Sequence, residues 1–340
     1  MKFNTIVGNP PYQISSAGDV NRTNALYHHF IEAATQLTTN YISLITPSRW
    51  MTKGGQSIPD TWVDKMLDCN HFIKIYDYLD SREFFNNVEI KGGISYFLYS
   101  NNYNGECDYI LESRAGLRER KAFLNSMGAG VVIRDIEAVN IIEKVVAVEG
   151  EYYIDNSFSN LVSSQHFFGK EAILATSWRG YAKEYDQDHC IKYHLNRNLE
   201  KSGVAWIRPS DIQRNYDSVD IYKVYLPKAC GTGNDPQVLT TPIFGEKGSA
   251  CSLTYLVIGY DPIKHNFTKE QCLNIMSYMK TKFFRYMVSI KKRTQDAMSS
   301  VFQFAPIQDF NKKWTDKELY DRYKLSEPER SYIEGLIKEL

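Results

Sequence analysis

Hydrophobic and polar residues alternate with two different periods along the first hundred positions of the chain. Short apolar runs with the length expected of β-strands occupy residues 3–7, 41–48, 72–79 and 93–100. Residues 25–37 and 61–69, which lie between these runs, place apolar side chains three or four positions apart, as the buried face of a helix requires. The pattern predicts an α/β domain in which strands and helices follow one another.

The pattern changes after about residue 112. Residues 134–147 have the period of an amphipathic helix. From there to about residue 260 the apolar runs are short and turn-forming residues are frequent, which is typical of loop-rich structure. The chain then becomes helical again, and Ser326-Glu327-Pro328-Glu329 has the pattern that opens a final helix. We therefore expect an α/β domain over residues 1–112 and a mixed α+β domain over residues 113–340.

Composition and charge limit the classes of protein to consider. A chain of 340 residues is long enough for two cores. It has 40 basic and 40 acidic residues, so contact with nucleic acid would depend on local clusters of charge. The 6 cysteines form no Cys-x-x-Cys pair, which argues against a zinc site or a disulfide framework and favours a reducing cytoplasm. No stretch reaches the roughly 20 apolar residues of a membrane span, so we expect a cytoplasmic protein without membrane contact.

Asn9-Pro10-Pro11-Tyr12 follows the first apolar run directly. A strand that ends here places the motif at the carboxyl edge of an α/β sheet, where such folds bind ligands. The prolines restrict the backbone, so the side-chain oxygen of Asn9 and the carbonyl oxygen of Pro10 form a rigid pair of acceptors. Such a pair suits a planar amino group, because accepting both hydrogens makes the nitrogen more nucleophilic. Tyr12 offers a face on which a heterocycle can stack, worth about 1–3 kcal/mol per base.

With this motif the sequence resembles the amino-methyltransferases that use S-adenosylmethionine, and more narrowly the adenine-specific DNA methyltransferases of bacterial restriction-modification systems. Residues 25–34, 41–51 and 84–100 are similar to the segments that follow the catalytic loop in that family, and residues 281–325 are similar to its C-terminal part. The resemblance implies that Asn9 and Pro10 bind the exocyclic amino group of a flipped adenine, and that Tyr12 stacks on the base. It also suggests Phe84 or Phe85 as the opposite wall of the base pocket, although an ordinary core position is an equal alternative.

In the family that the sequence resembles, a glycine-rich loop and an acidic residue that bind S-adenosylmethionine precede the Asn-Pro-Pro-Tyr strand. Only 8 residues precede Asn9 here, whereas one βαβ unit takes roughly 30 residues. We therefore expect a partial Rossmann-like methyltransferase sheet, followed by a target-recognition domain, with a separate chain as one source of the cosubstrate site.

Gly231 and Gly233, in residues 226–236, resemble a cosubstrate-binding loop found in related enzymes. A nucleotide-binding loop should lead into a helix, whereas this stretch leads into Pro236, so a turn of the recognition domain is the alternative that we favour. Pro59-Asp60 with Glu89-Ile90-Lys91 has the residue types of a metal-dependent nuclease, but the spacing is loose, and we expect neither a nuclease nor a metal site there.

Positive charge clusters near residue 285, which suggests how the chain could hold double-stranded DNA. The predicted phosphate-binding residues are Lys282, Arg285, Lys291, Lys292 and Arg293, on a helix whose other face is apolar. A solvated helix face is the alternative. Side chains of the types that read bases occur in the loop-rich middle of the chain, at Arg179, Arg208, Gln213, Arg214 and Asn215. His28-His29 has no third ligand nearby in the sequence, so we interpret the pair as surface or core packing.

These observations predict a site-specific DNA adenine methyltransferase of a restriction-modification system, with S-adenosylmethionine as its cosubstrate and no metal requirement. A restriction subunit is a further expected partner. Two alternatives remain open. The same motif also serves methylation of protein glutamine side chains and of RNA, and a DNA-recognition subunit or remnant without catalysis would explain the missing glycine loop.

Overall fold

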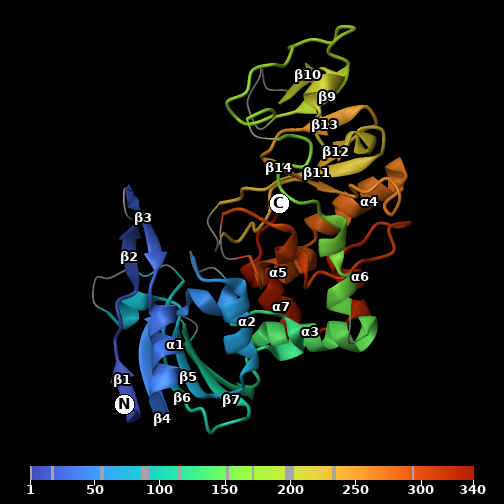
Figure 1. The fold of residues 1–340 in the computed structure, drawn as a ribbon. Helices are drawn as coiled ribbons and strands as arrows, with labels where there is room; N and C mark the ends of the chain where they lie inside the picture. The colour runs from blue at the N-terminus through green and yellow to red at the C-terminus, as the bar shows by residue number, and fades with distance from the viewer. Residues whose placement is uncertain are drawn as a thin grey trace. The chain divides into compact units, whose positions relative to one another are not determined.

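The computed structural model describes residues 2–16, 19–53, 57–85, 90, 92–113, 116–150, 153–170, 172–195, 203–231, 235–292 and 295–340. The chain divides into two compact units, Met1–Val139 and Asn140–Leu340, whose elements are labelled in Figure 1. Each unit has its own core.

The first unit is built on a mixed sheet of six strands in the order β1-β4-β6-β5-β7-β8. The strands are β1 (Phe3–Gly8), β4 (Thr38–Pro47), β5 (Phe72–Tyr78), β6 (Ile94–Tyr99), β7 (Cys107–Ser113) and β8 (Gly116–Ala122). β1 runs parallel to β4 and β5 runs parallel to β7, while the other neighbouring pairs are antiparallel. The predicted α/β class is confirmed.

Two helices, α1 (Tyr27–Leu37) and α2 (Asp60–Asp68), pack on one face of this sheet, and Figure 1 shows α1 lying across it. The helical period of the sequence explains the packing of α1 on the sheet, because the buried residues of α1 recur every three or four positions. On β4, Ile42 and Leu44 point into the same core. A two-stranded hairpin, β2 (Gln13–Ser16) and β3 (Asp19–Ala25), leaves the sheet between β1 and α1.

The first compact unit extends beyond the domain boundary expected near residue 112. That position falls in the strand pair β7–β8, and β8 continues the sheet. Residues 123–135 then lead to α3 (Ile136–Glu149), which spans the division between the units at Val139. The sequence missed this strand because most of its described side chains are exposed, so β8 has no apolar run.

The second unit contains two three-stranded sheets, in the orders β10-β9-β13 and β12-β11-β14. Its strands are β9 (Ile191–His194), β10 (Val204–Ile207), β11 (Lys223–Pro227), β12 (Ile243–Gly245), β13 (Ser249–Cys251) and β14 (Tyr255–Ile258). Its later helices are α4 (Lys269–Lys280), α5 (Lys282–Ser289), α6 (Asp316–Arg322) and α7 (Glu327–Leu336). Short strands, long loops and C-terminal helices match the predicted mixed α+β pattern.

The start of α7 is the one expected from the sequence. The carboxylate of Glu329 accepts a hydrogen bond of 2.6 Å from the backbone N–H of Ser326. This contact occupies a donor that would otherwise lack an intrahelical partner. The helix therefore begins where the capping-box pattern predicts.

Candidate functional site

The carboxyl ends of several strands meet at one edge of the first unit's sheet. Gly8, the last residue of β1, pairs in register with Leu44 of the parallel strand β4. β4 continues to Pro47, which lies opposite Ile94 at the start of β6, and Ile94 also faces Tyr78 at the end of β5. The Asn-Pro-Pro-Tyr motif therefore leaves the sheet at the edge where β4 and β5 also end, as the sequence predicted.

The motif itself is exposed at its polar end and anchored at its aromatic end. Asn9 is exposed and Pro10 is half-buried, and no described residue donates a hydrogen bond to the Pro10 carbonyl. The backbone carbonyl of Tyr12 accepts a hydrogen bond of 2.9 Å from the backbone N–H of Leu26, which ties the loop to the start of α1. The two acceptors expected from the sequence are thus open to a ligand on a loop that is fixed at one end.

Tyr12 is half-buried and packs against the core, with its ring centroid 6.5 Å from that of Tyr27. Burial raises the pKa of the Tyr12 hydroxyl to about 12, and the neighbouring Asn9 side chain partly offsets this rise. The hydroxyl is buried without a well-formed hydrogen bond to a described residue. Tyr12 therefore stays neutral at physiological pH and offers an aromatic ring rather than a charge.

Phe84 and Phe85 belong to an aromatic cluster on the neighbouring strands. The ring centroid of Phe84 lies 5.3 Å from that of Tyr78 and 6.0 Å from that of Tyr96, and Phe85 packs on Phe84 at 4.9 Å. Burial raises the pKa of Tyr96 to about 12. Because β4 separates β1 from β6 in the sheet, this cluster is centred away from the motif strand. The role of Phe84 or Phe85 as a wall of a base pocket stays a prediction.

A buried charged network lies at the same sheet edge and was not found in the sequence. The Asp77 carboxylate is fully buried on β5 and accepts hydrogen bonds from Ser48 Oγ at 2.6 Å and from Arg134 Nε at 2.5 Å and Nη2 at 2.6 Å. The Tyr109 hydroxyl donates to the same carboxylate. The signal that could have revealed it is the single carboxylate inside the apolar run of residues 72–79.

The network also holds the Gly92-Gly93 turn that precedes β6. Arg134 Nη1 donates to the Gly92 carbonyl at 2.7 Å, and the backbone N–H of Ser48 donates to the Gly93 carbonyl at 3.1 Å. Gly93 has a φ of +83°, and a Cβ atom there would lie 2.2 Å from the carbonyl oxygen of Tyr78. Only glycine fits this position, so the turn fixes the start of β6 against the end of β5.

The N-terminal part of the chain is similar to known proteins. Residues 1–85 match the Eco57I restriction-modification methylase family. The predicted resemblance to adenine-specific methyltransferases of restriction-modification systems is confirmed here. A protein of Mycoplasma pneumoniae described as an uncharacterized adenine-specific methylase is 39% identical over 108 residues, which are 31% of this chain and 25% of that protein.

Two solved structures also match most of the length of this chain, at low identity. The DrdV–DNA complex covers 98% of this chain and 44% of its own, at 9% identity and a TM-score of 0.43. The type IIG restriction endonuclease BpuSI covers 94% of this chain and 48% of its own, at 12% identity and a TM-score of 0.36. The chain therefore spans a quarter of the curated methylase and less than half of these structures.

In the second unit, the predicted DNA-binding residues do not form an exposed ridge. Arg285 is fully buried, and its Nη1 donates to the carbonyl oxygens of Lys338 at 2.6 Å and Gln237 at 3.2 Å. Lys292 is also buried, with Nζ 3.4 Å from the Cys230 carbonyl oxygen.

The remaining members of that set are held by neighbours or are not described. Lys282 Nζ pairs with Glu334 at 2.5 Å and Glu339 at 2.8 Å, and Lys291 Nζ donates to Gln303 at 2.5 Å. Arg293 lies outside the described residues. The contacts of Lys282 and Arg285 join α5 to C-terminal segments of its own unit. Most residues of α5 are buried, so its cations lie beside the core of that unit.

The glycine loop after β11 does not lead into a helix. Gly231 has a φ of +50°, and a Cβ atom there would lie 1.9 Å from the Asp235 carboxylate. The side chain of Asp235 caps its own turn by accepting from the Gln237 backbone N–H at 2.9 Å. The chain continues to β12, a strand of an antiparallel sheet, and Gly233 lies outside the described residues. The described part of this loop is therefore a turn, and its place in cosubstrate binding or in a recognition domain stays a prediction.

All five residues proposed to read bases are exposed, namely Arg179, Arg208, Gln213, Arg214 and Asn215. Two of them also contact neighbouring backbone: Gln213 accepts from the Lys170 backbone N–H at 2.7 Å, and Asn215 donates to the Phe167 carbonyl at 2.7 Å. These two side chains thus join neighbouring loops.

Other expectations concern metals, nucleases and membranes. His28 is buried against Trp62, with ring centroids 5.6 Å apart. Asp60 begins α2, while Glu89 and Lys91 lie outside the described residues. In the described ranges, no group of three or more histidine, cysteine or acidic side chains could hold a metal ion. None of the helices described is long and apolar enough to cross a membrane.

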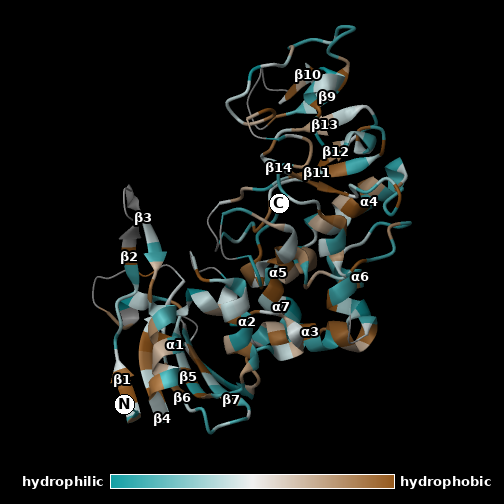
Figure 2. Ribbon diagram, in the orientation of Figure 1, coloured by the Kyte–Doolittle hydropathy of each residue, from teal (hydrophilic) through white to brown (hydrophobic). Residues whose placement is uncertain are grey.

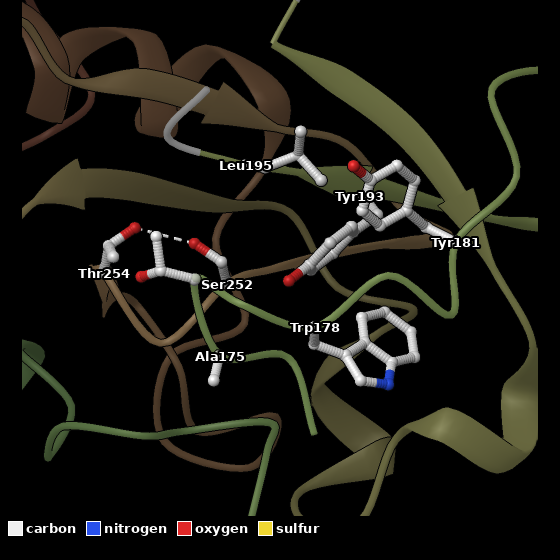
Figure 3. A pocket seen from close by; sticks show the side chains of 8 residues that line it. Ala175, Trp178, Tyr181, Tyr193, Leu195, Ser252 and Thr254 are labelled. Atoms are coloured by element: carbon white, nitrogen blue, oxygen red, sulfur yellow. Dashed lines mark hydrogen bonds between the residues drawn. The ribbon is translucent and has the colours of Figure 1, made fainter. Parts of the chain in front are cut away.

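The second unit also contains a small aromatic cavity, shown in Figure 3. Trp178, Tyr181 and Tyr193 surround it with centroid separations of 6.0 to 6.4 Å, and the Ser252 and Thr254 hydroxyls, 2.7 Å apart, lie at the other end. Its free volume is about 10 Å³, room for roughly one water molecule. The cavity is too small for a nucleobase in this conformation.

We expect His194, in the core of the second unit, to make stability depend on pH. Burial first, and the charge of Lys192 second, lower the His194 pKa to about 4. In the unfolded chain the His194 imidazole binds a proton as pH falls below about 6.5, whereas in the folded chain it does so only near pH 4. The free energy of unfolding should therefore decrease as pH falls from about 6.5 to 4, by an amount on the order of 3 kcal/mol. Urea unfolding at several pH values should show this loss in the wild type and a smaller one in His194→Gln. His189→Gln is the matched control, because the wild-type His189 ring pairs with Asp186 instead of lying in the core. An equal loss in wild type and His194→Gln would contradict the assignment of this pH dependence to His194.

Proposed function

We propose that this chain transfers a methyl group from S-adenosylmethionine to the exocyclic amino group of adenine in DNA, as part of a restriction-modification system. The observation that carries the proposal is the pair of acceptors formed by the exposed Asn9 side chain and the Pro10 carbonyl at the carboxyl edge of β1. The match of residues 1–85 to a restriction-modification methylase family supports it.

In this proposal Asn9 and Pro10 accept the two hydrogens of the adenine amino group. Accepting both draws the nitrogen lone pair out of conjugation and aims it outward, so no strong base is required before attack. Pro11 stiffens the loop, and the ring of Tyr12 offers a stacking surface for the base. The cosubstrate supplies an electrophilic methyl group when it is bound. Catalysis by the chain's own residues is then positioning and polarisation of the amine.

We further propose that polypeptide pairing with the open edge of β1 supplies the cosubstrate site. Among the described strands, β1 has a neighbour on one side only. Val7 on this strand is 75% exposed and Phe3 is 44% exposed, and Figure 2 shows the hydrophobic colour along β1. An unpaired apolar edge is a site for strand addition, since its N–H and C=O groups have no partner in the sheet.

The test measures transfer of labelled methyl groups from S-adenosylmethionine to duplex DNA, RNA and protein, with the 340-residue chain alone and with the proteins that co-purify with it. We expect label on adenine in DNA, with transfer by the chain alone absent or weak. Label on protein glutamine or on RNA would instead favour those acceptors. DNA binding without transfer in either preparation would favour a recognition subunit without catalysis.

Calorimetric titration of S-adenosylmethionine tests the site at the β1 edge separately. We expect no binding to the chain alone and binding once its partner is present. Val7→Lys, which places a charge on the open edge, should prevent both association and cosubstrate binding, while Leu117→Lys on β8 at the opposite edge should not. Stoichiometric binding to the isolated chain would contradict the need for added polypeptide.

A further inference from the structure

Arg49 occupies the same sheet edge as the Asn-Pro-Pro-Tyr motif. It lies in the short helix η1 (Ser48–Thr52), which begins directly after β4, the neighbour of β1. Its side chain is half-buried, and it makes no hydrogen bond, ion pair or ring contact with any described residue. Arginine has five donors in a rigid fork and remains charged at physiological pH, so this guanidinium is ready to bind an anion.

The surrounding fold holds the stem of Arg49 in place. Gly92 has a φ of +90°, and a Cβ atom there would lie 2.4 Å from Arg49 Cγ, so the missing side chain makes room for the arginine. The carbonyl oxygen of Gly92 is fixed by Arg134 at 2.7 Å. Because its stem rests on a fixed glycine turn, Arg49 loses less side-chain entropy on binding than an arginine that is wholly in solvent.

Two other cations of the first unit form ion pairs within it. Lys53 pairs with Asp64 at 2.6 Å, and Arg82 pairs with Asp80 at 2.6 Å. Arg49, by contrast, has no side-chain partner among the described residues of the first unit, which leaves its guanidinium available to a ligand.

Tyr27 connects Arg49 to the motif. The ring of Tyr27 lies 6.5 Å from that of Tyr12, measured between centroids. Burial raises the pKa of the Tyr27 hydroxyl, and the positive charge of Arg49 and a hydrogen bond with the Trp50 backbone partly offset this rise. Arg49 is therefore close enough to Tyr27 to act on it electrostatically, so the cation and the proposed stacking ring flank the same tyrosine.

We propose that Arg49 binds a backbone phosphate of the DNA beside the adenine that stacks on Tyr12. This inference rests on the proposed function and names a DNA contact that positions the substrate. A base extruded toward the motif carries its own flanking phosphates to this sheet edge, and a guanidinium can bind a phosphate through two parallel hydrogen bonds. Such a contact sets the register of the DNA without reading its sequence.

The experiment measures DNA affinity by fluorescence anisotropy over a range of salt concentrations, with the full chain and a duplex that contains the adenine labelled in the transfer assay. We expect Arg49→Ala to weaken binding by about tenfold, and to lower the slope of log affinity against log salt by about 0.9. Arg49→Lys should keep the slope and lose part of the affinity, because lysine retains the charge but not the fork. Arg82→Ala, which removes an exposed arginine already paired with Asp80, should change neither quantity.

A neutral methylphosphonate placed at single positions of the duplex locates the contact. A methylphosphonate at one phosphate flanking the target adenine should weaken DNA binding by the wild type. The same substitution should not weaken binding by Arg49→Ala any further, because the contact is already absent. Additive losses at every position, or an unchanged salt slope in Arg49→Ala, would overturn the inference. Weaker cosubstrate binding by Arg49→Ala in the presence of the partner, with unchanged DNA binding, would overturn it too, since the anion would then be the cosubstrate carboxylate. Failure of the wild type to bind any duplex would instead contradict the proposed function.

Discussion

Asn9→Ala should abolish methyl transfer while leaving DNA affinity nearly unchanged. Asn9 is exposed at the end of β1, so its removal takes away one of the two proposed acceptors without opening a cavity. Loss of one positioned electrostatic group at a reacting centre costs about 10²- to 10³-fold in rate, and the amine would then keep its lone pair in conjugation. The measurement is single-turnover transfer of labelled methyl groups to duplex DNA by the chain together with the proteins that co-purify with it, with anisotropy as the parallel measure of binding.

The matched control is Asn4→Ala on the same strand. The Asn4 side chain accepts hydrogen bonds from Thr5 at 3.2 Å and Asn40 at 3.3 Å and lies toward the other end of β1. This variant should transfer methyl groups at the wild-type rate. Equal rates in wild type and Asn9→Ala would remove the motif from the proposed site, and a parallel loss of DNA binding would make Asn9 a binding residue instead.

Asp77→Ala should destabilise the first unit by about 3–5 kcal/mol. The substitution leaves the buried guanidinium of Arg134 without its carboxylate and removes the acceptor of Ser48 Oγ. Breaking one side of a buried pair is costly because the remaining charge stays away from water. Hydrogen exchange of the β5 and β6 amides, which lie in this unit, reports its opening apart from that of the second unit.

Asp80→Ala tests whether burial is the cause. Asp80 also pairs with an arginine, Arg82, but the Arg82 side chain is 54% exposed, so the loss should stay below about 1 kcal/mol. Similar losses in the two variants would show that the buried network contributes no more than a surface pair. Asp77→Ala should also release the Gly92-Gly93 turn, and with it the support of Arg49.

Several parts of the fold and of the candidate site follow from local sequence. The apolar runs of β4, β5 and β6 and the helical periods of α1 and α2 specify an α/β unit, since each pattern matches one backbone geometry. The capping-box residues Ser326 and Glu329 determine the start of α7. The position of Asn9 at a strand end follows from the same reasoning, because two prolines cannot continue a strand in the middle of a sheet.

The sequence was a weaker guide wherever distant residues decide burial. The cations near residue 285 have the spacing of an exposed face, yet Arg285 is fully buried because its partners, the carbonyls of Gln237 and Lys338, come from segments far away in the chain. β8 was missed because its pairing with β7, and not its own apolar content, makes it a strand.

By itself, then, the sequence determined the class of the first unit, the start of α7 and the residues of the Asn-Pro-Pro-Tyr motif, all of which depend on local periodicity, capping and backbone restriction. The tertiary structure alone decided that Asp77, Arg134 and Ser48 form one buried network, and that the stem of Arg49 rests on Gly92 at the sheet edge that carries the motif. The physical reason is that the free energy of a charge depends on which groups surround it, and those groups come from segments that lie far apart in the chain.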